Sequence, residues 1–250
     1  MNRFAVLVVL VVLLASLVGC SSDGDDGATL LPAGEATATP SPSATPTAAV
    51  TPDPAATDLE TSPRVGRAVI VDSFDTVGPE ALPAHEFEWG AAIGSWAAER
   101  GVARVVSPAS EGGVPALVIA GTQTADGLVQ VTMSQVTNGS GLAFRLKTAA
   151  NYWALVAAPP FATWNLVKVV EGEAETVGNV GVAPVAAGTT IGVMLDGDDI
   201  RVMIDGRVRL TLSDRTHNDG TWIGLVAQGG PVTEARWDDV LVMAAAAPGS

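Results

Sequence analysis

Three glutamates, Glu171, Glu173 and Glu175, alternate with small residues in the sequence EGEAE. In a strand, this spacing puts neighbouring carboxylates on one face. Two carboxyl groups about 5 Å apart are what retaining glycoside hydrolysis needs. The run lies beside a turn, however, and we interpret it as a solvated acidic turn rather than a catalytic pair.

A second set of side chains suits the binding of a sugar. It consists of Arg145, Tyr152, Trp153, Trp164 and Lys168. Sugar sites combine an aromatic platform with a few polar groups. If these residues share one face of a sheet, they form a candidate ligand-binding surface. The alternative is that the aromatic rings belong to the core and the charged groups reach solvent from strand ends.

Other constellations of chemical groups are weak. His85 and His217 are far apart in the sequence and both fall in predicted loops, so we predict neither a metal pair nor a Ser–His couple. Residues 196–199, DGDD, lack the further ligands and the closing glutamate of an EF-hand loop. We interpret them as a hairpin turn.

The single cysteine, Cys20, ends the first segment of the chain. Arg3 gives a basic start, and residues 4–18 form an apolar run of the length of a signal-peptide core. Leu17-Val18-Gly19-Cys20 then resembles the lipobox of bacterial lipoproteins. The resemblance implies that residues 1–19 are a signal peptide, that Cys20 takes a diacylglyceryl thioether, and that the chain is anchored to the cell membrane on its extracytoplasmic side. Two or more acyl chains anchor stably where one does not.

Residues 20–64 are predicted to form a lipidated cysteine and a disordered linker. Ala, Thr, Pro and Ser dominate this stretch, and large apolar residues are almost absent. Such a segment buries too little apolar surface to fold, and its prolines favour extended polyproline II. At about 3.1 Å per residue, about 40 residues reach at most roughly 120 Å.

Charge excludes some partners. The chain has 13 Lys and Arg residues against 27 Asp and Glu, for a net charge of −14. This balance disfavours nucleic acid, because binding to phosphates rests on basic residues. With one cysteine, no intrachain disulfide can form.

Residues 65–246 are predicted to form one all-β domain. No segment has a convincing helical period, and residues 91–100, the nearest candidate, are interrupted by Gly94. Short strands separated by turn signals are typical of an antiparallel two-sheet sandwich. The predicted strands are residues 68–74, 96–98, 102–107, 116–120, 128–136, 142–147, 152–157, 164–169, 174–180, 190–195, 200–204, 208–212, 222–227 and 235–243.

The order of the signals in this domain resembles the concanavalin A-like, laminin-G-like jelly rolls. The segments that carry the resemblance are VDSFD (71–75), GSW (94–96), GLAFR (141–145), NYW (151–153), LVKV (166–169), GVMLDG (192–197), IRVMIDG (200–206), Asp214, Gly220, GL (224–225) and WDDV (237–240). The resemblance implies two antiparallel sheets of about six or seven strands each, one of the sheets being concave. Members bind glycans, hydrolyse them, or do neither. The E-x-D-x-(x)-E set of laminarinase-type members has no match here.

The resemblance also implies a possible structural calcium ion where the first and last strands meet. Asp72 and Asp75 would come from the first strand and Asp238 from the last. Carboxylate oxygens are ligands that calcium prefers. The alternative is that Asp72 and Asp75 cap a turn and Asp238 is solvated. No other cofactor is predicted.

Three functions remain open from the sequence. The first is a surface-anchored module that binds glycan or cell-envelope polysaccharide. The second is a glycoside-active enzyme with an unrecognised site, and the third is a non-catalytic protein-interaction module. Exposed aromatic rings on the concave face favour the first, facing carboxylates the second, and an apolar or covered face the third. The oligomeric state is not predicted.

Overall fold

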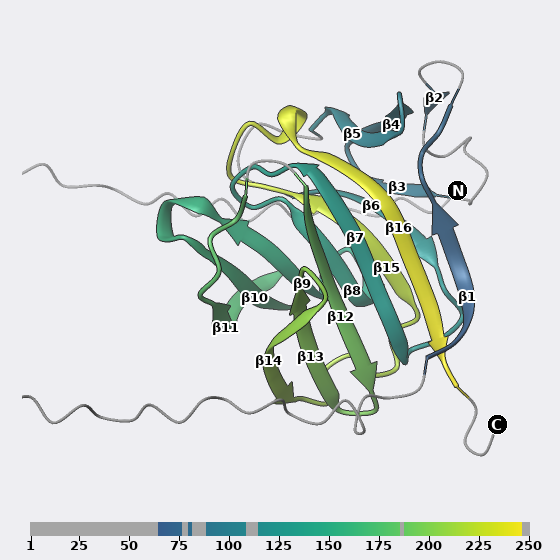
Figure 1. Cartoon of the computed structure of the whole chain (residues 1–250), viewed down its shortest axis with the longest axis vertical. Coiled ribbons are helices and arrows are strands. Elements are labelled where there is room, and N and C mark those ends of the chain that lie inside the picture. The colour runs from purple at the N-terminus through teal and green to yellow at the C-terminus, as the bar shows by residue number, and fades with distance from the viewer. Residues whose placement is uncertain (1–64, 77–79, 82–88, 109–114, 186–187, 247–250) are drawn as a thin grey trace, which may run out of the picture. The chain divides into compact units, whose positions relative to one another are not determined.

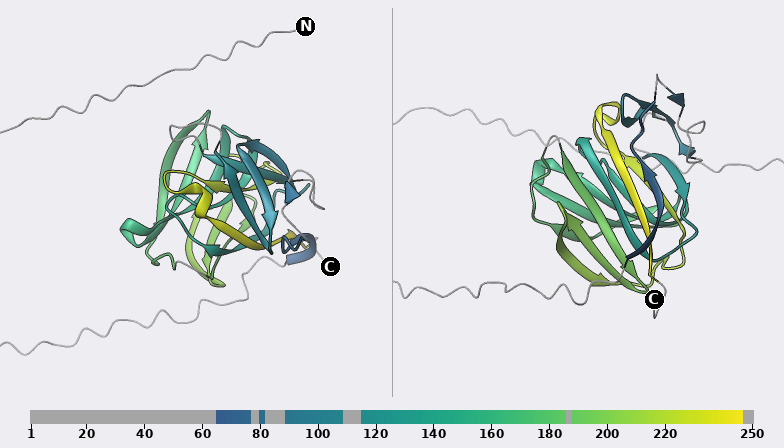
Figure 2. Two further views of the ribbon diagram at one scale, coloured as in Figure 1. Left: turned by 90° about the horizontal axis from the view of Figure 1, so that it is seen from above. Right: turned by 45° about the vertical axis from the view of Figure 1, so that its right-hand side comes forward.

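Strands that alternate between apolar and polar residues pair into two antiparallel sheets, which face each other as the layers of a sandwich (Figures 1 and 2). The computed structural model describes residues 65–76, 80–81, 89–108, 115–185 and 188–246. The signal peptide, Cys20, the linker and His85 lie outside the described residues. Among the described residues, no helix has the length and apolar character needed to cross a membrane.

The first sheet has nine strands. Its spatial order is β14 (Arg207–Ser213), β13 (Asp199–Ile204), β12 (Thr189–Asp196), β7 (Gly127–Gln135), β16 (Arg236–Ala245), β5 (Val102–Ser107), β4 (Ser95–Glu99) and β2 (Glu80–Ala81), and β1 (Val65–Asp72) pairs with β16. The first and last strands of the domain therefore lie side by side, with Val65 paired to Ala245 and Asp72 paired to Val240.

The second sheet has seven strands. Its order is β11 (Glu173–Val180), β10 (Thr163–Val170), β9 (Asn151–Ala158), β8 (Gly141–Thr148), β15 (Trp222–Ala227), β6 (Ala116–Gly121) and β3 (Gly90–Ile93). Two short 3₁₀ helices, η3 (Pro159–Phe161) and η4 (Val232–Glu234), lie between strands.

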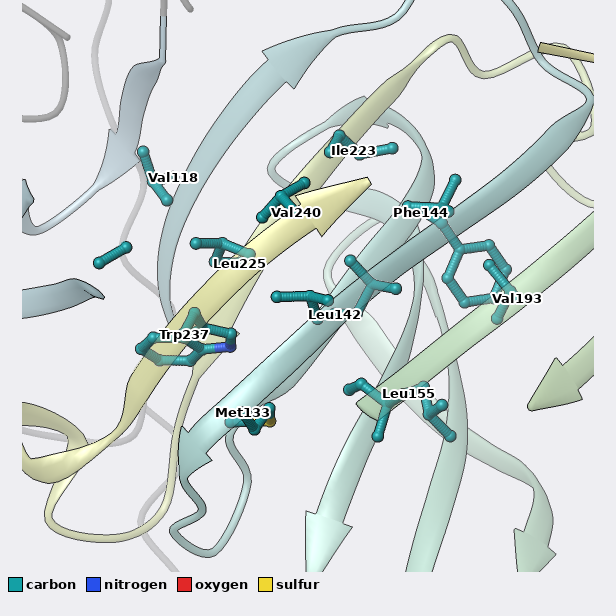
Figure 3. Packing of buried hydrophobic residues seen from close by; sticks show 14 of the residues in the cluster. Val118, Met133, Leu142, Phe144, Leu155, Val193, Ile223, Leu225, Trp237 and Val240 are labelled. Atoms are coloured by element: carbon teal, nitrogen blue, oxygen red, sulfur yellow. The ribbon is translucent and has the colours of Figure 1, made fainter. Parts of the chain in front are cut away.

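The main core fills the space between the two sheets. Strand β8 contributes Leu142 and Phe144, β9 contributes Trp153 and Leu155, and the facing sheet contributes residues such as Trp237. Figure 3 shows part of this cluster. Ring contacts within the core include Phe144 stacked on Trp153 with centroids 6.4 Å apart. The core is therefore built by burial of apolar side chains, as expected for a domain without disulfides.

A second apolar cluster lies on the opposite face of the seven-stranded sheet. It includes Tyr152, Ala154 and Val156 of β9 together with Val167 and Val169 of β10. Every residue of β9 from Tyr152 to Ala158 is buried, so this strand is covered on both faces, which fits its almost wholly apolar sequence.

The predicted two-sheet sandwich is confirmed, and most strands begin and end within a few residues of their predicted positions. The hairpin turn predicted for residues 196–199 is also confirmed, because Asp196 of β12 pairs with Asp199 of β13. The first sheet exceeds the expected six or seven strands. Two short strands, β2 and β3, were not predicted, because two to four residues are too few for a visible alternation.

Candidate functional site

Arg145 lies inside the molecule rather than on an open face. Its φ of 47° interrupts the regular strand, and a register shift between β8 and β15 falls at the same place. Its side chain is 1% exposed. The guanidinium donates to the backbone oxygens of Gly197, Asp199 (3.4 Å) and Asp214 (3.0 Å). Arg145 therefore connects β8 to the β12–β13 turn and to the segment that follows β14.

The electrostatic surroundings of Arg145 fit this structural role. Burial lowers the pKa of Arg145, and the nearby charges of Asp126, Asp198, Asp214 and Asp199 oppose that effect. Arg145 shares these carboxylates with two other cations, since Lys168 pairs with Asp214 and Arg215 pairs with Asp198.

Lys168 lies on the core-facing side of β10, at the margin of the sandwich. Its Nζ is 3.3 Å from Asp214 Oδ2 and 3.5 Å from Glu175 Oε2, and it stands 5.6 Å from the centre of the Trp153 ring. Burial would lower the pKa of Lys168, but the hydrogen bonds and charges of Asp214 and Glu175 raise it. Lys168 is therefore already paired with two carboxylates.

The two tryptophans of the predicted surface are fully buried. Trp153 donates from Nε1 to the backbone oxygen of Thr216 (2.8 Å), and Trp164 packs in the main core. Trp153 and Trp164 therefore belong to the core, which was the alternative to a sugar-binding surface in the sequence analysis. Of the five predicted ligand-binding residues, only Tyr152 belongs to the outer face of the seven-stranded sheet. Burial raises the pKa of its phenol.

That outer face is hollowed. One hollow of about 350 Å³ has a floor of Tyr152, Ala154, Val167 and Val169. A second hollow, of about 360 Å³, extends towards Asn138 and Phe161. The two hollows share Val156, Val167, Ala174 and Gln228. We call them together the trough. Each has the volume of a small-molecule site, which is about 300–1,000 Å³.

The polar side chains of the trough carry amides and hydroxyls. Asn165 lies on its floor, and the Oδ1 atom of Asn165 is buried without a hydrogen-bond partner among the described residues. Gln228 and Thr176 also line it. Because a buried acceptor without a donor is costly, Asn165 Oδ1 is suited to accept a hydrogen bond from a ligand.

Phe161, like Asn165 and Gln228, lines the trough and was not predicted from the sequence. It ends η3 and its side chain is 80% exposed. The signal was present: Phe161 follows Pro159-Pro160 in a turn, where no strand can bury a large aromatic ring. On the same outer face, beyond the trough, Trp222 is 41% exposed and lies over Gly121.

The trough has no acid–base chemistry in its described lining, which contains neither Asp, Glu, His nor Cys. The alternating glutamates point elsewhere: Glu171 and Glu173 are exposed and Glu175 pairs with Lys168. His217 contacts the backbone oxygen of Val169 through Nε2 (2.9 Å). Glu175 and Asp214 do approach each other, because both pair with Lys168 Nζ, but they lie on the core-facing side of β10 and neither lines the trough.

The predicted calcium ligands are engaged with other groups. Asp72 Oδ1 accepts from the backbone nitrogen of Phe74 and Oδ2 from Trp89 Nε1, both at 2.8 Å. Asp75 Oδ2 accepts from the hydroxyl of Ser73 (3.0 Å), and Asp238 Oδ1 accepts from the backbone nitrogen of Asp239 (2.8 Å). Within the described ranges, no three His, Cys, Asp or Glu side chains converge to hold a metal ion. The calcium site stays a prediction. It is tested by comparing the melting temperature of the chain in calcium with that in a chelator.

Comparison with known proteins identifies the architecture. No family model matches the chain, and no curated protein matches it. Among solved structures, the laminarinase from Rhodothermus marinus matches with a TM-score of 0.51 and 12% identity, over 74% of this chain and 99% of that one. A chain from a study of endo-acting O-glycanases of the human gut microbiota matches with a TM-score of 0.50 and 9% identity, over 72% and 100%. The carbohydrate-binding module CBM66 from Bacillus subtilis has a TM-score of 0.43 and 15% identity, over 63% and 92%. The first two similarities are similarities of fold, and they agree with the two-sheet jelly-roll sandwich described above.

Proposed function

We propose that this chain is a non-catalytic binding module that holds a neutral stretch of glycan in the trough. The observation that carries the proposal is the trough itself. It joins two hollows of about 350 and 360 Å³ on one sheet face, with aromatic and amide groups and no carboxylate in its described lining.

The lining suits a sugar in two ways. A pyranose presents an apolar C–H face, which packs on the rings of Tyr152 and Phe161 and on the valines of the floor. Its hydroxyls can donate to Asn165 Oδ1 and bond with Gln228. The laminarinase and the O-glycanase structures add support by analogy of fold alone.

A second candidate is a peptide-binding module. Val156, Val167, Val169 and Val226 make most of the trough floor aliphatic, and aliphatic surface suits apolar side chains as well as sugar rings. Binding of an apolar peptide in place of glycan, with the same loss on mutation of Phe161, is the result that favours this candidate.

We expect Phe161→Ala to weaken glycan binding about five- to tenfold, because it removes an exposed ring from the rim of the trough. The intact chain is purified in a polyoxyethylene detergent, which carries no sugar. It is then tested on an array of neutral glycans that includes laminarin and mucin O-glycans. Val71→Ala is the matched control, since Val71 is 60% exposed on β1 of the other sheet.

Three results contradict the proposal: no binding to any neutral glycan, equal loss in the Val71→Ala control, or release of reducing sugar from a bound glycan. The last result moves the chain to the enzyme class that the sequence left open.

We also propose that Cys20 anchors the module to the cell membrane on its extracytoplasmic side. The support is the lipobox Leu17-Val18-Gly19-Cys20 after an apolar run of signal-peptide length. The wild-type chain is expected to incorporate a labelled fatty acid, whereas Cys20→Ala is expected to remain unlabelled and unprocessed. Identical labelling and processing of the two chains rules out the anchor.

A further inference from the structure

A separate hollow of about 440 Å³ lies between β1 and the turn that connects β6 to β7. Its volume is within the range of small-molecule sites, about 300–1,000 Å³. None of its lining residues lines the trough. Most of the side chains around it are polar, in contrast to the aliphatic floor of the trough, and they include Arg67, Thr122, Gln123 and Thr124.

Arg67 supplies to this hollow a positive charge that no described residue neutralises. The side chain is exposed, and it makes no hydrogen bond or ion pair with any described residue. Other cations of the chain, such as Arg104, Lys147 and Lys168, are paired with carboxylates. A guanidinium presents a planar fork of N–H donors that matches a carboxylate with two parallel hydrogen bonds.

The turn beside Arg67 is held by its own hydroxyl groups. Thr122 Oγ1 lies 2.7 Å from the backbone oxygen of Thr221 and 2.8 Å from that of Thr124, and Thr124 Oγ1 donates to the backbone oxygen of Asp126 (2.8 Å). Gln123, at the tip, is exposed with a φ of 56°. Its amide has no partner among the described residues, so it can both donate to and accept from a ligand.

An aromatic ring stands next to the same turn. Carbon atoms of the Trp222 ring lie 3.8 Å from where a side chain at Gly121 would begin, and Gly121 lines the hollow. The ring is 41% exposed. Trp222 does not itself line the hollow, but its ring offers a stacking surface next to Gly121 and the turn that carries Gln123.

We propose that this hollow is a second binding site, for a sugar that carries one carboxylate, such as a uronic acid residue of a sparsely charged glycan. The carboxylate of the sugar accepts hydrogen bonds from the Arg67 guanidinium, and a hydroxyl of the sugar bonds with the Gln123 amide. The sugar ring stacks against the indole ring of Trp222. The charge of the protein limits the ligand, because a net charge of −14 repels densely charged polyanions. The acidic residue of the same turn, Asp126, does not line the hollow, and its Oδ1 atom accepts a hydrogen bond from the backbone nitrogen of Gly197 (3.0 Å).

The test is a binding titration of the intact chain, in the same sugar-free detergent, with galacturonate, galactose and acetate. We expect galacturonate to bind at least about tenfold more tightly than galactose or acetate. Arg67→Gln is expected to weaken galacturonate binding about tenfold or more, because it removes a charge-assisted pair. Trp222→Ala is expected to bring galacturonate down towards the affinity of acetate.

Two variants serve as controls. Arg209→Gln removes another exposed arginine from β14, at the far edge of the same sheet, and is expected to leave galacturonate binding unchanged. Phe161→Ala, which tests the trough, is also expected to leave it unchanged, so failure of one site is distinguishable from failure of the other. The proposal is overturned if galacturonate does not bind, if acetate binds equally well, or if Arg209→Gln causes the same loss as Arg67→Gln.

Discussion

Phe144→Ala is expected to lower the free energy of unfolding by about 3–5 kcal/mol. Phe144 has no exposed surface, lies on β8 between the sheets, and stacks on Trp153. Truncation removes a buried ring and leaves a cavity that neighbouring strands cannot close, because both sheets fix their positions.

Denaturant unfolding of the intact chain measures this loss. The chain provides a matched control, since Phe161→Ala is the same chemical change at a side chain that is 80% exposed. We expect the control to change stability by no more than about 0.5 kcal/mol. A loss below about 1 kcal/mol for Phe144→Ala contradicts the packing described for β8.

Arg145→Met is expected to cost about 3 kcal/mol or more in unfolding free energy. The substitution preserves much of the side-chain volume but removes the donors for the backbone oxygens of Gly197, Asp199 and Asp214. Hydrogen bonds that involve a charged group contribute about 1.5–3 kcal/mol each. The four surrounding aspartates also lose their buried counter-charge.

The same unfolding assay tests this prediction, with Lys147→Met as control. Lys147 is two positions further along β8, is exposed, and makes one ion pair with Asp219 (2.6 Å). The control is expected to lose less than about 1 kcal/mol, as exposed pairs do. Equal stability of Arg145→Met and the wild-type chain means that the guanidinium is not needed to hold the two turns.

The strands were predictable because their alternation is local. Leu142 and Phe144 could be assigned to one face from the sequence, and both lie in the main core. Which residues of β9 lie on which face of the sheet could not be derived in the same way. A strand buried on both faces is apolar at every position, so Tyr152 and Trp153 look equivalent in sequence although they lie on opposite faces.

The candidate site was predictable only in part for related reasons. Arg145 follows the alternation of β8 until a backbone with positive φ turns it between the sheets, and nothing in the local pattern signals that change. Arg67 and Gln123 come from segments more than fifty residues apart. Only the pairing of β1 with β16, and the position of the β6–β7 turn beside it, brings them to one hollow.

The pairing of Val65 with Ala245 has a topological consequence. Directly opposed residues of an antiparallel ladder have Cα atoms about 4.5–5.5 Å apart. The domain therefore begins and ends at nearly the same point in space. A linker of a few residues can join these two ends, and a circularly permuted chain can open instead at the exposed Glu171-Gly172 turn. The same closeness allows the whole sandwich to be inserted into a surface loop of a host protein without forcing the two sides of that loop apart.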